Sequence, residues 1–504
     1  MPATLHQNLS DAAVRYAEKA FLIAVDRALT FREADEVTSA VALRFRELGI
    51  QPGDRVTLWL ENGWRWVVSY FAVLRLGAIV NPTNILLTAE EVAYIVQDCG
   101  SKLVIVSNDK LGALAALVSV PIVGDRPADT PGRSNIEEFA IGSDAASRAD
   151  WPECDELSVS TLCYTSGTTG RPKGAVLRHR SVVLNSAMTA VMHGRTAADI
   201  VVSALPCSHV YGNVVLNAAV LCGMTLVLLP RFDEVTALAA IQRHRATMFE
   251  GVPAMYMRLL NFKDFGTFDL TSLRVCTAGG QTMPVSTMAE VERRFGCPLL
   301  ELWGMTELGG LGTTHPHRGP HRLGSIGVPL PLMEIRVVQM DDPSVEVASG
   351  EVGELVIRGP FVMSGYHGDV ESTRAAIDSQ GWLRTGDLVK RDADGYLFVV
   401  DRRKEVIISG GYNIYPAEVE RVIAEHPAVS MIAVAAMKDE LLGQVPKAFV
   451  VRRIGASCTP LDIIDHCRRS LASYKVPKAV EFLDDLPRNS TGKILRRALA
   501  TSTI

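Results

Sequence analysis

The sequence predicts an α/β fold in which layered, mostly parallel sheets form a large N-terminal domain. Two observations predict this class. Short apolar runs alternate with amphipathic stretches along most of the chain, and no repeat of fixed period appears. The chain has 504 residues, more than one ordinary hydrophobic core holds, so we expect roughly three packed units.

The first alternating series begins near Ala12. Residues 55–60 and 102–107 have the apolar character of buried strands, whereas residues 64–76 and 110–117 are amphipathic. Strands separated by helical stretches favour a parallel sheet with helices on its faces.

A second series of apolar runs predicts a further sheet. Its strands are expected at residues 225–230, 246–251, 273–280 and 298–304. The most apolar long stretch, Val214–Leu229, is shorter than the about 18 residues that cross a membrane, and it contains Asn217 and Gly223. We therefore expect a buried helix followed by a strand there, and no transmembrane segment.

The pattern changes in the last third of the chain. Short strands with turn signals, at residues 353–359 and 392–400, predict a small antiparallel or barrel-like subdomain. A tail of about a hundred residues follows, with strand and helix signals of its own, long enough for a separate α+β domain. We predict an N-terminal domain at 1–400 and a C-terminal domain at 401–504.

Composition excludes several function classes. Hydrophobic residues make up 48% of the chain, charged residues 21%, and the net charge is −5, which disfavours a nucleic-acid partner. The nine cysteines are scattered without a CxxC pair, and the N-terminus lacks the apolar run of a secretory signal. We expect a cytoplasmic protein, with peripheral membrane contact open if its substrate is a lipid. The oligomeric state is not determined, and a homodimer remains open.

A loop rich in glycine and hydroxyl side chains follows the apolar run 160–164. Its sequence, YTSGTTGRPKG at Tyr164–Gly174, offers many hydrogen-bond donors and a lysine, which suits a polyphosphate, although it lacks the P-loop spacing. The alternative is a simple Gly/Ser/Thr turn. The expected nucleotide-binding residues of this loop are Thr165, Ser166, Gly167, Thr168, Thr169 and Lys173.

This loop resembles the signature of the adenylate-forming superfamily, which includes acyl-CoA synthetases, peptide-synthetase adenylation domains and beetle luciferases. Further motifs follow in the family's order, so that the resemblance covers nearly the whole chain and is closest in kind to bacterial fatty or aryl acid:CoA ligases. It implies ATP, Mg²⁺ and coenzyme A as cofactors or co-substrates, and a small mobile C-terminal domain.

The resemblance also assigns the rest of the nucleotide site. It places Gly279, Gly280 and Gln281 near the adenine, and it gives Trp303 an adenine-stacking role, Thr306 a bond to the α-phosphate and Glu307 a bond to magnesium. Asp387 and Arg402 would hold the ribose hydroxyls. Read singly, Trp303 could be a core residue and Asp387 a turn residue.

In the C-terminal domain, the resemblance makes Lys493 the catalytic lysine. A cation that bridges the acid and the α-phosphate lowers the barrier between two anions. Asp401 would be the hinge, and Gly410 and Gly411 would face the pantetheine of CoA after domain rotation. Acylation of Lys493 as regulation is a hypothesis.

The acyl pocket is assigned by family position. His209 is expected near the substrate carboxylate, and the pocket residues are Tyr211, Asn213, Gly251, Val252, Thr277, Met305 and Gly310. The glycines, Gly309 included, are expected to leave room for length. The set contains no Lys or Arg, which favours a neutral fatty or aryl acid, such as a benzoate or cinnamate, over a dicarboxylate.

The sequence thus predicts an ATP-dependent ligase that forms an acyl-adenylate and then an acyl-CoA. One alternative is a free-standing enzyme that loads a carrier-protein thiol, and the lack of a carrier domain after Ile504 favours CoA. A luciferase-like oxygenase and a non-catalytic nucleotide-binding protein are further alternatives. A possible metal site is suggested by three histidines close in sequence, His315, His317 and His321. Their loop lacks a carboxylate or Cys at ligand spacing, so we expect a basic loop there rather than a metal site.

Overall fold

The computed structural model describes residues 4–127, 134–141, 149–165, 172–487, 494 and 496–501. The chain forms two compact units. Unit 1 comprises Met1–Glu334 and Ile357–Leu383, and unit 2 comprises Ile335–Val356 and Arg384–Ile504. The division of the chain at residues 400 and 401 stays a prediction.

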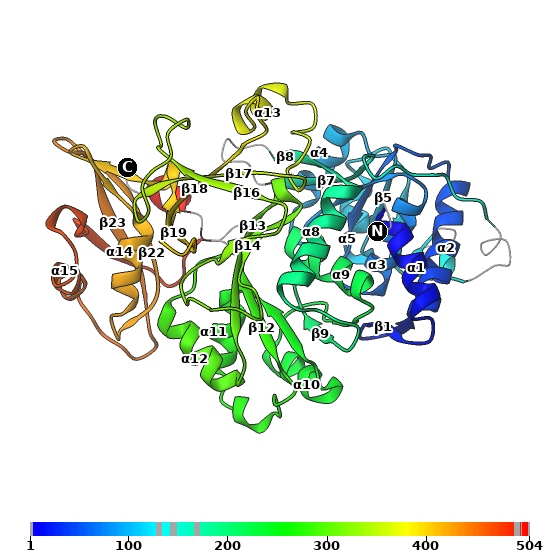
Figure 1. Cartoon of the computed structure of the whole chain (residues 1–504), viewed down its shortest axis with the longest axis horizontal. Helices are drawn as coiled ribbons and strands as arrows, with labels where there is room; N and C mark the ends of the chain where they lie inside the picture. Colours follow the sequence, from blue (N-terminus) through cyan, green and yellow to red (C-terminus); the bar gives the residue numbers. More distant parts are fainter. Residues whose placement is uncertain are drawn as a thin grey trace. The chain divides into compact units, whose positions relative to one another are not determined.

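Unit 1 contains a six-stranded sheet with the order β6-β5-β3-β4-β7-β8. Figure 1 labels β5, β7 and β8 of this sheet. Its strands are parallel except for the β7–β8 pair, as the alternating pattern predicts. Its strands are β3 (Arg55–Trp59), β4 (Ile79–Pro82), β5 (Leu103–Val106), β6 (Ile122–Gly124), β7 (Val159–Thr165) and β8 (Lys173–Arg178). The helices that alternate with them are α3 (Trp64–Arg75), α4 (Ala89–Cys99), α5 (Asn108–Ala115) and α6 (Ile136–Phe139).

A nine-stranded sheet of unit 1 has the order β15-β14-β13-β12-β11-β9-β10-β1-β2. The strands from β13 to β1 along this order are parallel, and the outer pairs are antiparallel. The strands are β1 (Ala20–Ile23), β2 (Ala28–Thr30), β9 (Ile200–Ser203), β10 (Thr225–Leu228), β11 (Met248–Gly251), β12 (Val275–Gly279), β13 (Leu299–Met305), β14 (Gly310–Thr314) and β15 (Val328–Pro329).

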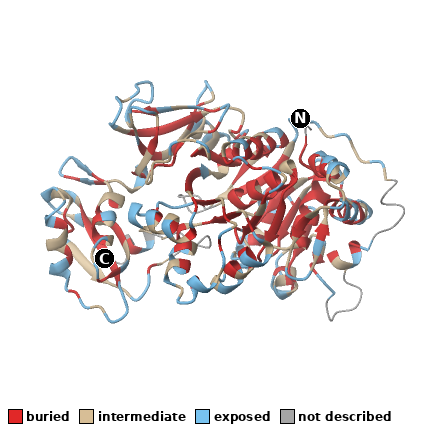
Figure 2. Cartoon of the chain, turned by 60° about the horizontal axis from the view of Figure 1, so that its bottom comes forward, coloured by how far each residue is buried: buried red, intermediate tan, exposed pale blue. Residues whose placement is uncertain are grey.

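Three helices cover one face of this sheet. Leu238 of α10, Tyr256 of α11 and Phe295 of α12 pack with Phe249 and Cys276 of the strands in one buried cluster. The remaining helical segments of unit 1 are α1 (Leu5–Arg15), α2 (Phe31–Glu47), α8 (His179–Met192), α9 (Val210–Cys222), α10 (Glu234–His244), α11 (Pro253–Asn261), η1 (Phe265–Thr267), α12 (Val285–Phe295), η2 (Thr306–Leu308) and α13 (Val370–Ala376). Figure 2 shows buried residues along the strands and on the helices that pack against them.

Local sequence explains several boundaries. Thr30 begins α2 with a capping box, in which its hydroxyl accepts from the backbone N–H of Glu33 and the Glu33 carboxylate accepts in return. Gly223 ends α9 in the left-handed conformation, and β10 follows at Thr225. The predicted buried helix followed by a strand over Val214–Leu229 is therefore confirmed. No helix of the described residues is long and apolar enough to span a membrane.

The last third of the chain forms two further sheets. The expected small antiparallel piece is a four-stranded sheet in the order β16-β17-β18-β19. A second sheet, in the order β21-β20-β23-β22 with β24 beside β23, packs against α14 and α15. The strands are β16 (Glu334–Val338), β17 (Val352–Arg358), β18 (Leu383–Arg391), β19 (Leu397–Arg402), β20 (Ile407–Ser409), β21 (Tyr412–Ile414), β22 (Val429–Asp439), β23 (Gly443–Arg452) and β24 (Ala479–Phe482). The helical segments are η3 (Arg403–Glu405), α14 (Pro416–Ala424), α15 (Pro460–Arg468), η4 (Ser473–Lys475) and α16 (Arg496–Thr501).

Candidate functional site

In unit 1, the assigned nucleotide residues lie where parallel strands end. Strands β11, β12 and β13 are in parallel register, so that their carboxyl ends meet at one edge of the sheet, the usual place of ligand sites in α/β folds. A Cβ on Gly279 would lie 2.2 Å from the Leu302 side chain, and Gly280 has φ +91. Glycine is therefore required at 279 by the close packing of β12 on β13 and favoured at 280 by a left-handed turn. Both reasons hold independently of any bound ligand.

Thr306 and Glu307 lie in the tight turn between β13 and β14. The two strands pair antiparallel, with Met305 opposite Gly310. A Cβ on Gly304 would lie 2.2 Å from the backbone oxygen of Gly310, so only glycine allows this approach. The turn presents a hydroxyl and a carboxylate directly after the strand, as the sequence predicts.

The Glu307 carboxylate has a defined partner. It is 8% exposed, and the Tyr366 hydroxyl donates to its Oε1 at 2.8 Å. Burial and the charge of Glu307 raise the pKa of Tyr366, so the phenol keeps its proton and holds the carboxylate in place. One carboxylate beside a hydroxyl fits magnesium that takes its other ligands from phosphates and water, and Glu307 is the residue that would hold it.

Lys173 lies beside the same tyrosine. It pairs with Thr165 in the β7–β8 register, so the loop between these strands begins and ends at neighbouring positions. Its ammonium is 3.5 Å from an Asp369 carboxylate oxygen and 5.6 Å from the centroid of the Tyr366 ring. Lys173, Tyr366 and Glu307 thus form one cluster, the phosphate cluster. Ser166, Gly167, Thr168 and Thr169 lie outside the described residues.

Trp303 is buried rather than presented on the surface. The side chain is 8% exposed, and a Cβ on Gly312 would lie 2.4 Å from its ring. The ring therefore packs closely over the Gly312 backbone. Gln281, by contrast, lies in the exposed segment after β12.

His209 begins helix α9. Its Nδ1 accepts from the backbone N–H of Tyr211 at 3.2 Å. A neutral imidazole in this arrangement carries its proton on Nε2, which makes His209 a donor there. In the same helix, the Asn213 side-chain oxygen accepts from Asn217 at 2.9 Å.

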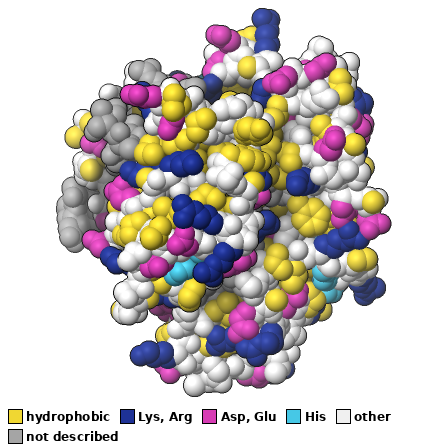
Figure 3. Space-filling view, turned by 90° about the vertical axis from the view of Figure 1, so that its left-hand side faces the viewer, with side chains coloured by type: hydrophobic (Ala, Val, Ile, Leu, Met, Phe, Trp, Pro, Cys, Tyr) yellow, Lys and Arg dark blue, Asp and Glu magenta, His cyan; other side chains and the backbone are white. Residues whose placement is uncertain are grey.

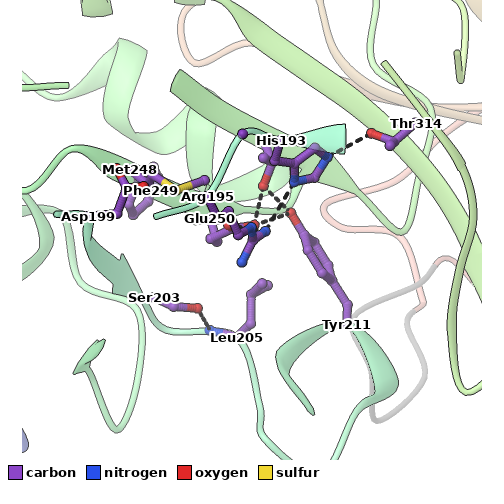
Figure 4. Close-up of polar contacts among 12 residues, drawn as sticks. His193, Arg195, Asp199, Ser203, Leu205, Tyr211, Met248, Phe249, Glu250 and Thr314 are labelled. Carbon is purple, nitrogen blue, oxygen red and sulfur yellow. Dashed lines mark hydrogen bonds and ion pairs between the residues drawn. The ribbon is translucent and has the colours of Figure 1, made fainter. Parts of the chain in front are cut away.

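Tyr211 and Thr277 belong to a buried polar network, which Figure 4 shows. The Tyr211 hydroxyl donates to Oε2 of Glu250 at 3.2 Å, and the Thr277 hydroxyl donates to the same oxygen. Arg195 donates to Oε1 of Glu250 at 2.7 Å. The side chains of Arg195 and Glu250 are both 0% exposed. Burial and the charge of Glu250 raise the pKa of Tyr211, which keeps its proton.

The ion pair of Arg195 and Glu250 was not predicted from the sequence. A single acid within the apolar strand ATMFEG was the available signal for Glu250, whereas nothing in the sequence brings Arg195 next to it. The expectation that glycines leave room for substrate is wrong at Gly310, since a Cβ there would lie 2.4 Å from Asn185 and 2.5 Å from Val214. Neighbouring side chains fill that space.

In unit 2, the two ribose candidates form an ion pair. Asp387 lies opposite Arg402 in the β18–β19 register, and their side chains are 2.5 Å apart. The carboxylate is buried, and the guanidinium is about four-tenths exposed. Antiparallel register therefore brings together two residues that are far apart in the sequence.

Asp401 joins strand β19 to helix α14. Its carboxylate oxygens accept from the backbone N–H groups of Arg402 and Ala417, both at 2.7 Å, and so it caps the helix that begins at Pro416. Burial raises its pKa to about 6. The hinge role of Asp401 stays a prediction.

The exposed hairpin between β20 and β21 turns on Gly410 and Gly411, both with positive φ. Exposed apolar side chains surround it, namely Ile408, Tyr412, Leu441 and Leu442, and Figure 3 shows hydrophobic, lysine and arginine side chains intermixed on the face that it draws.

Lys493 lies outside the described residues. Three residues later, Arg496 binds both carboxylate oxygens of Glu420 at 3.0 and 2.7 Å, and it also pairs with Glu405. The chain is therefore anchored just after the predicted catalytic lysine. Among the described residues, no three His, Cys, Asp or Glu side chains cluster as metal ligands would.

Comparisons with known proteins agree on one family. Residues 9–367 match the family described as AMP-binding enzyme, and residues 418–493 match the AMP-binding enzyme C-terminal domain. A long-chain-fatty-acid–CoA ligase of Bacillus subtilis is 34% identical over 98% of this chain and 94% of its own. A 3-[(3aS,4S,7aS)-7a-methyl-1,5-dioxo-octahydro-1H-inden-4-yl]propanoyl:CoA ligase of Mycobacterium tuberculosis is 36% identical over 95% of this chain and 94% of its own.

Solved structures agree as well. The O-succinylbenzoate coenzyme A synthetase of Bacillus subtilis, in complex with ATP and magnesium ion, superposes with a TM-score of 0.86 at 31% identity, covering 98% of each chain.

Proposed function

This chain belongs to the AMP-binding enzyme family and is an AMP-forming acid:CoA ligase, and we propose that it activates a fatty or aryl carboxylic acid through the residues assigned above. The observation that carries the residue assignment is the phosphate cluster. The Lys173 ammonium at the start of β8, the Tyr366 phenol and the Glu307 carboxylate after β13 lie together, and these are groups that bind a polyphosphate and its magnesium.

In the first half-reaction, the acid's carboxylate oxygen attacks the α-phosphorus of ATP, and pyrophosphate leaves. Lys173 and Thr306 would bind phosphate oxygens and Lys493 would bridge the two anions, so that their repulsion falls. Magnesium, when bound, neutralises phosphate charge, and Glu307 would hold it. The Asp387 carboxylate would accept hydrogen bonds from the ribose hydroxyls, and the Arg402 guanidinium would donate to them.

In the second half-reaction, the CoA sulfur attacks the acyl carbon, the thiol loses its proton, and AMP leaves with the bonding electrons. His209 would already have held the substrate carboxylate through its Nε2–H in the first half-reaction. Gly410 and Gly411 would face the pantetheine once the C-terminal domain has turned about Asp401. The cap from Asp401 to Ala417 would join the hinge residue to the first helix of the domain that turns.

Mass-spectrometric detection of acyl-CoA tests this proposal. The enzyme is incubated with ATP, magnesium, CoA and one acid at a time, from short to long fatty acids and from benzoic to cinnamic acid. We expect one class to give acyl-CoA and equimolar AMP. Release of pyrophosphate without loss of CoA would point instead to a carrier-protein thiol as the acceptor.

We also propose a cytoplasmic location. All nine cysteines are free thiols, and most are buried, which suits a reducing compartment. Fractionation of cells followed by immunoblotting tests this, and recovery in the membrane fraction after a high-salt wash would contradict it.

A further inference from the structure

The buried pair of Arg195 and Glu250 is not explained by the chemistry assigned so far. Two charges with no solvent exposure carry a large desolvation penalty, and apolar side chains of similar size at such a site are often as stable or more so. Stability alone therefore gives no reason for this pair.

Arg195 also has unused hydrogen-bonding capacity. Its Nη2 donates to Glu250 and lies 3.1 Å from Nδ1 of His193. Its Nε and Nη1 are buried and have no hydrogen-bond partner within the described part of the chain. Each buried donor left without a partner costs about 1–3 kcal/mol, a cost that an acceptor supplied by a ligand would remove.

The histidine beside it is neutral. Burial and the charge of Arg195 hold the pKa of His193 well below its usual value. Its Nδ1 faces the guanidinium, so that its proton lies on Nε2, 2.9 Å from the Thr314 hydroxyl. His193 thus adds no charge, and the network carries one positive and one negative charge.

The network lies on the side of the sheet where the acyl group is expected. Phe249 and Cys276 point into the core under α10, α11 and α12. Their strand neighbours Glu250 and Thr277 face the opposite way, where they meet Tyr211 of α9. Tyr211 and Thr277 are themselves assigned to the acyl pocket. Glu250, which accepts from both, and Arg195, which donates to Glu250 (Figure 4), would therefore form the polar side of that pocket.

We propose that this network is a polar subsite of the acyl pocket, a proposal that rests on the proposed function. The subsite would select acids whose acyl group carries a neutral oxygen acceptor, such as a ketone, away from the carboxylate. Arg195 would donate to that oxygen through Nε and Nη1. Glu250 already neutralises the guanidinium, so that a second carboxylate would bring uncompensated negative charge into a buried site. A purely hydrocarbon tail would leave the donors unpaired.

Matched pairs of acids test this inference. One set compares straight-chain fatty acids with the same acids bearing a ketone at successive positions, and another compares 4-acetylphenyl with 4-isopropylphenyl acids. We expect kcat/KM for acyl-CoA formation to favour the ketone by about tenfold or more at one position, with most of the effect in KM, as for a site built to hydrogen-bond. A ratio near one at every position would overturn the proposal.

A double variant tests which residues are responsible. Arg195→Met with Glu250→Leu removes both charges together, so that no unpaired charge remains buried. The preference should fall to about one while the unsubstituted acid still reacts. Tyr256→Phe is the matched control, because its buried hydroxyl donates to the backbone oxygen of Thr277 from the other face of the sheet. The control should keep the preference.

Retention of the preference in the double variant would overturn the assignment. Should the double variant fail to fold, Tyr211→Phe removes only a hydroxyl of the network and should still reduce the preference several-fold. Failure of every acid, with or without a ketone, would refute the proposed function itself and this inference with it.

Discussion

Glu301 of β13 should make unit 1 less stable as the pH rises. The residue is 5% exposed, its Oε2 has no hydrogen-bond partner in the portion of the chain that is described, and burial raises its pKa to about 8 from an ordinary 4.5. The folded state therefore keeps a proton that the unfolded chain releases. The stability that the protonated form contributes is complete below pH 4.5, and it is lost as the pH rises through about 8.

The size of the effect follows from the two pKa values. Each pKa unit corresponds to about 1.36 kcal/mol, so the contribution of Glu301 to the free energy of unfolding should fall by about 3–4 kcal/mol between pH 5 and pH 8. Buried histidines with lowered pKa values, such as His193, change stability in the opposite direction, so the contribution of Glu301 is measured as a difference between variants. In Glu301→Gln the side chain cannot ionise, so the stability of this variant relative to the unaltered protein should rise by that amount between pH 5 and pH 8.

Urea unfolding followed by tryptophan fluorescence measures the effect. All six tryptophans lie in unit 1, so the signal reports that unit. Glu36→Gln, at an exposed position of α2, is the matched control and should follow the unaltered protein. The same pH dependence of the free energy of unfolding in Glu301→Gln and in the unaltered protein between pH 5 and pH 8 would refute the reasoning.

Three further substitutions test the site and its turn. Lys173→Ala should lower kcat/KM for ATP by about 100-fold, because a phosphate-binding cation is lost, as initial rates at varied ATP would show. Tyr366→Phe leaves the Glu307 carboxylate without its phenol donor, and it should raise several-fold the magnesium concentration that gives half-maximal rate. Gly304→Ala should lower the free energy of unfolding by about 1–3 kcal/mol or more in urea titrations, because its Cβ would meet the Gly310 oxygen.

Two of these substitutions have a control variant in unit 1, and the third has a contradicting outcome. Lys102→Ala changes an exposed lysine and should leave ATP kinetics unaltered, and equal losses in both lysine variants would contradict the assigned role of Lys173. Gly266→Ala meets no atom within 4 Å and should cost little, so a similar cost there would remove the steric explanation for Gly304. An unchanged magnesium dependence in Tyr366→Phe would argue against Glu307 as the metal ligand.

Local sequence predicted much of the fold. Strand and helix periodicity located the alternating segments, and the buried helix and strand over Val214–Leu229 follow from apolar character and one glycine. The positions of the residues that follow strands β12 and β13 were also predictable, because a strand end and a turn signal are both local features of the sequence.

Long-range contacts were not predictable in this way. The pairing of Arg195 with Glu250 joins residues 55 positions apart, and it depends on how a loop after α8 meets the face of β11. Gly310 was read as free space, yet Asn185 of α8 fills it. Tyr366 and its bond to Glu307 also escaped notice, since neither the spacing nor the residue type marks that tyrosine in the sequence.

Acid-dependent exchange of labelled pyrophosphate into ATP, measured without CoA, tests the central claim most directly. Adenylation as a separate first half-reaction predicts rapid exchange with the preferred acid, little without it, and a loss of at least about 100-fold in Lys493→Ala. Exchange that requires CoA, or no exchange with any acid in a folded preparation, would contradict the account.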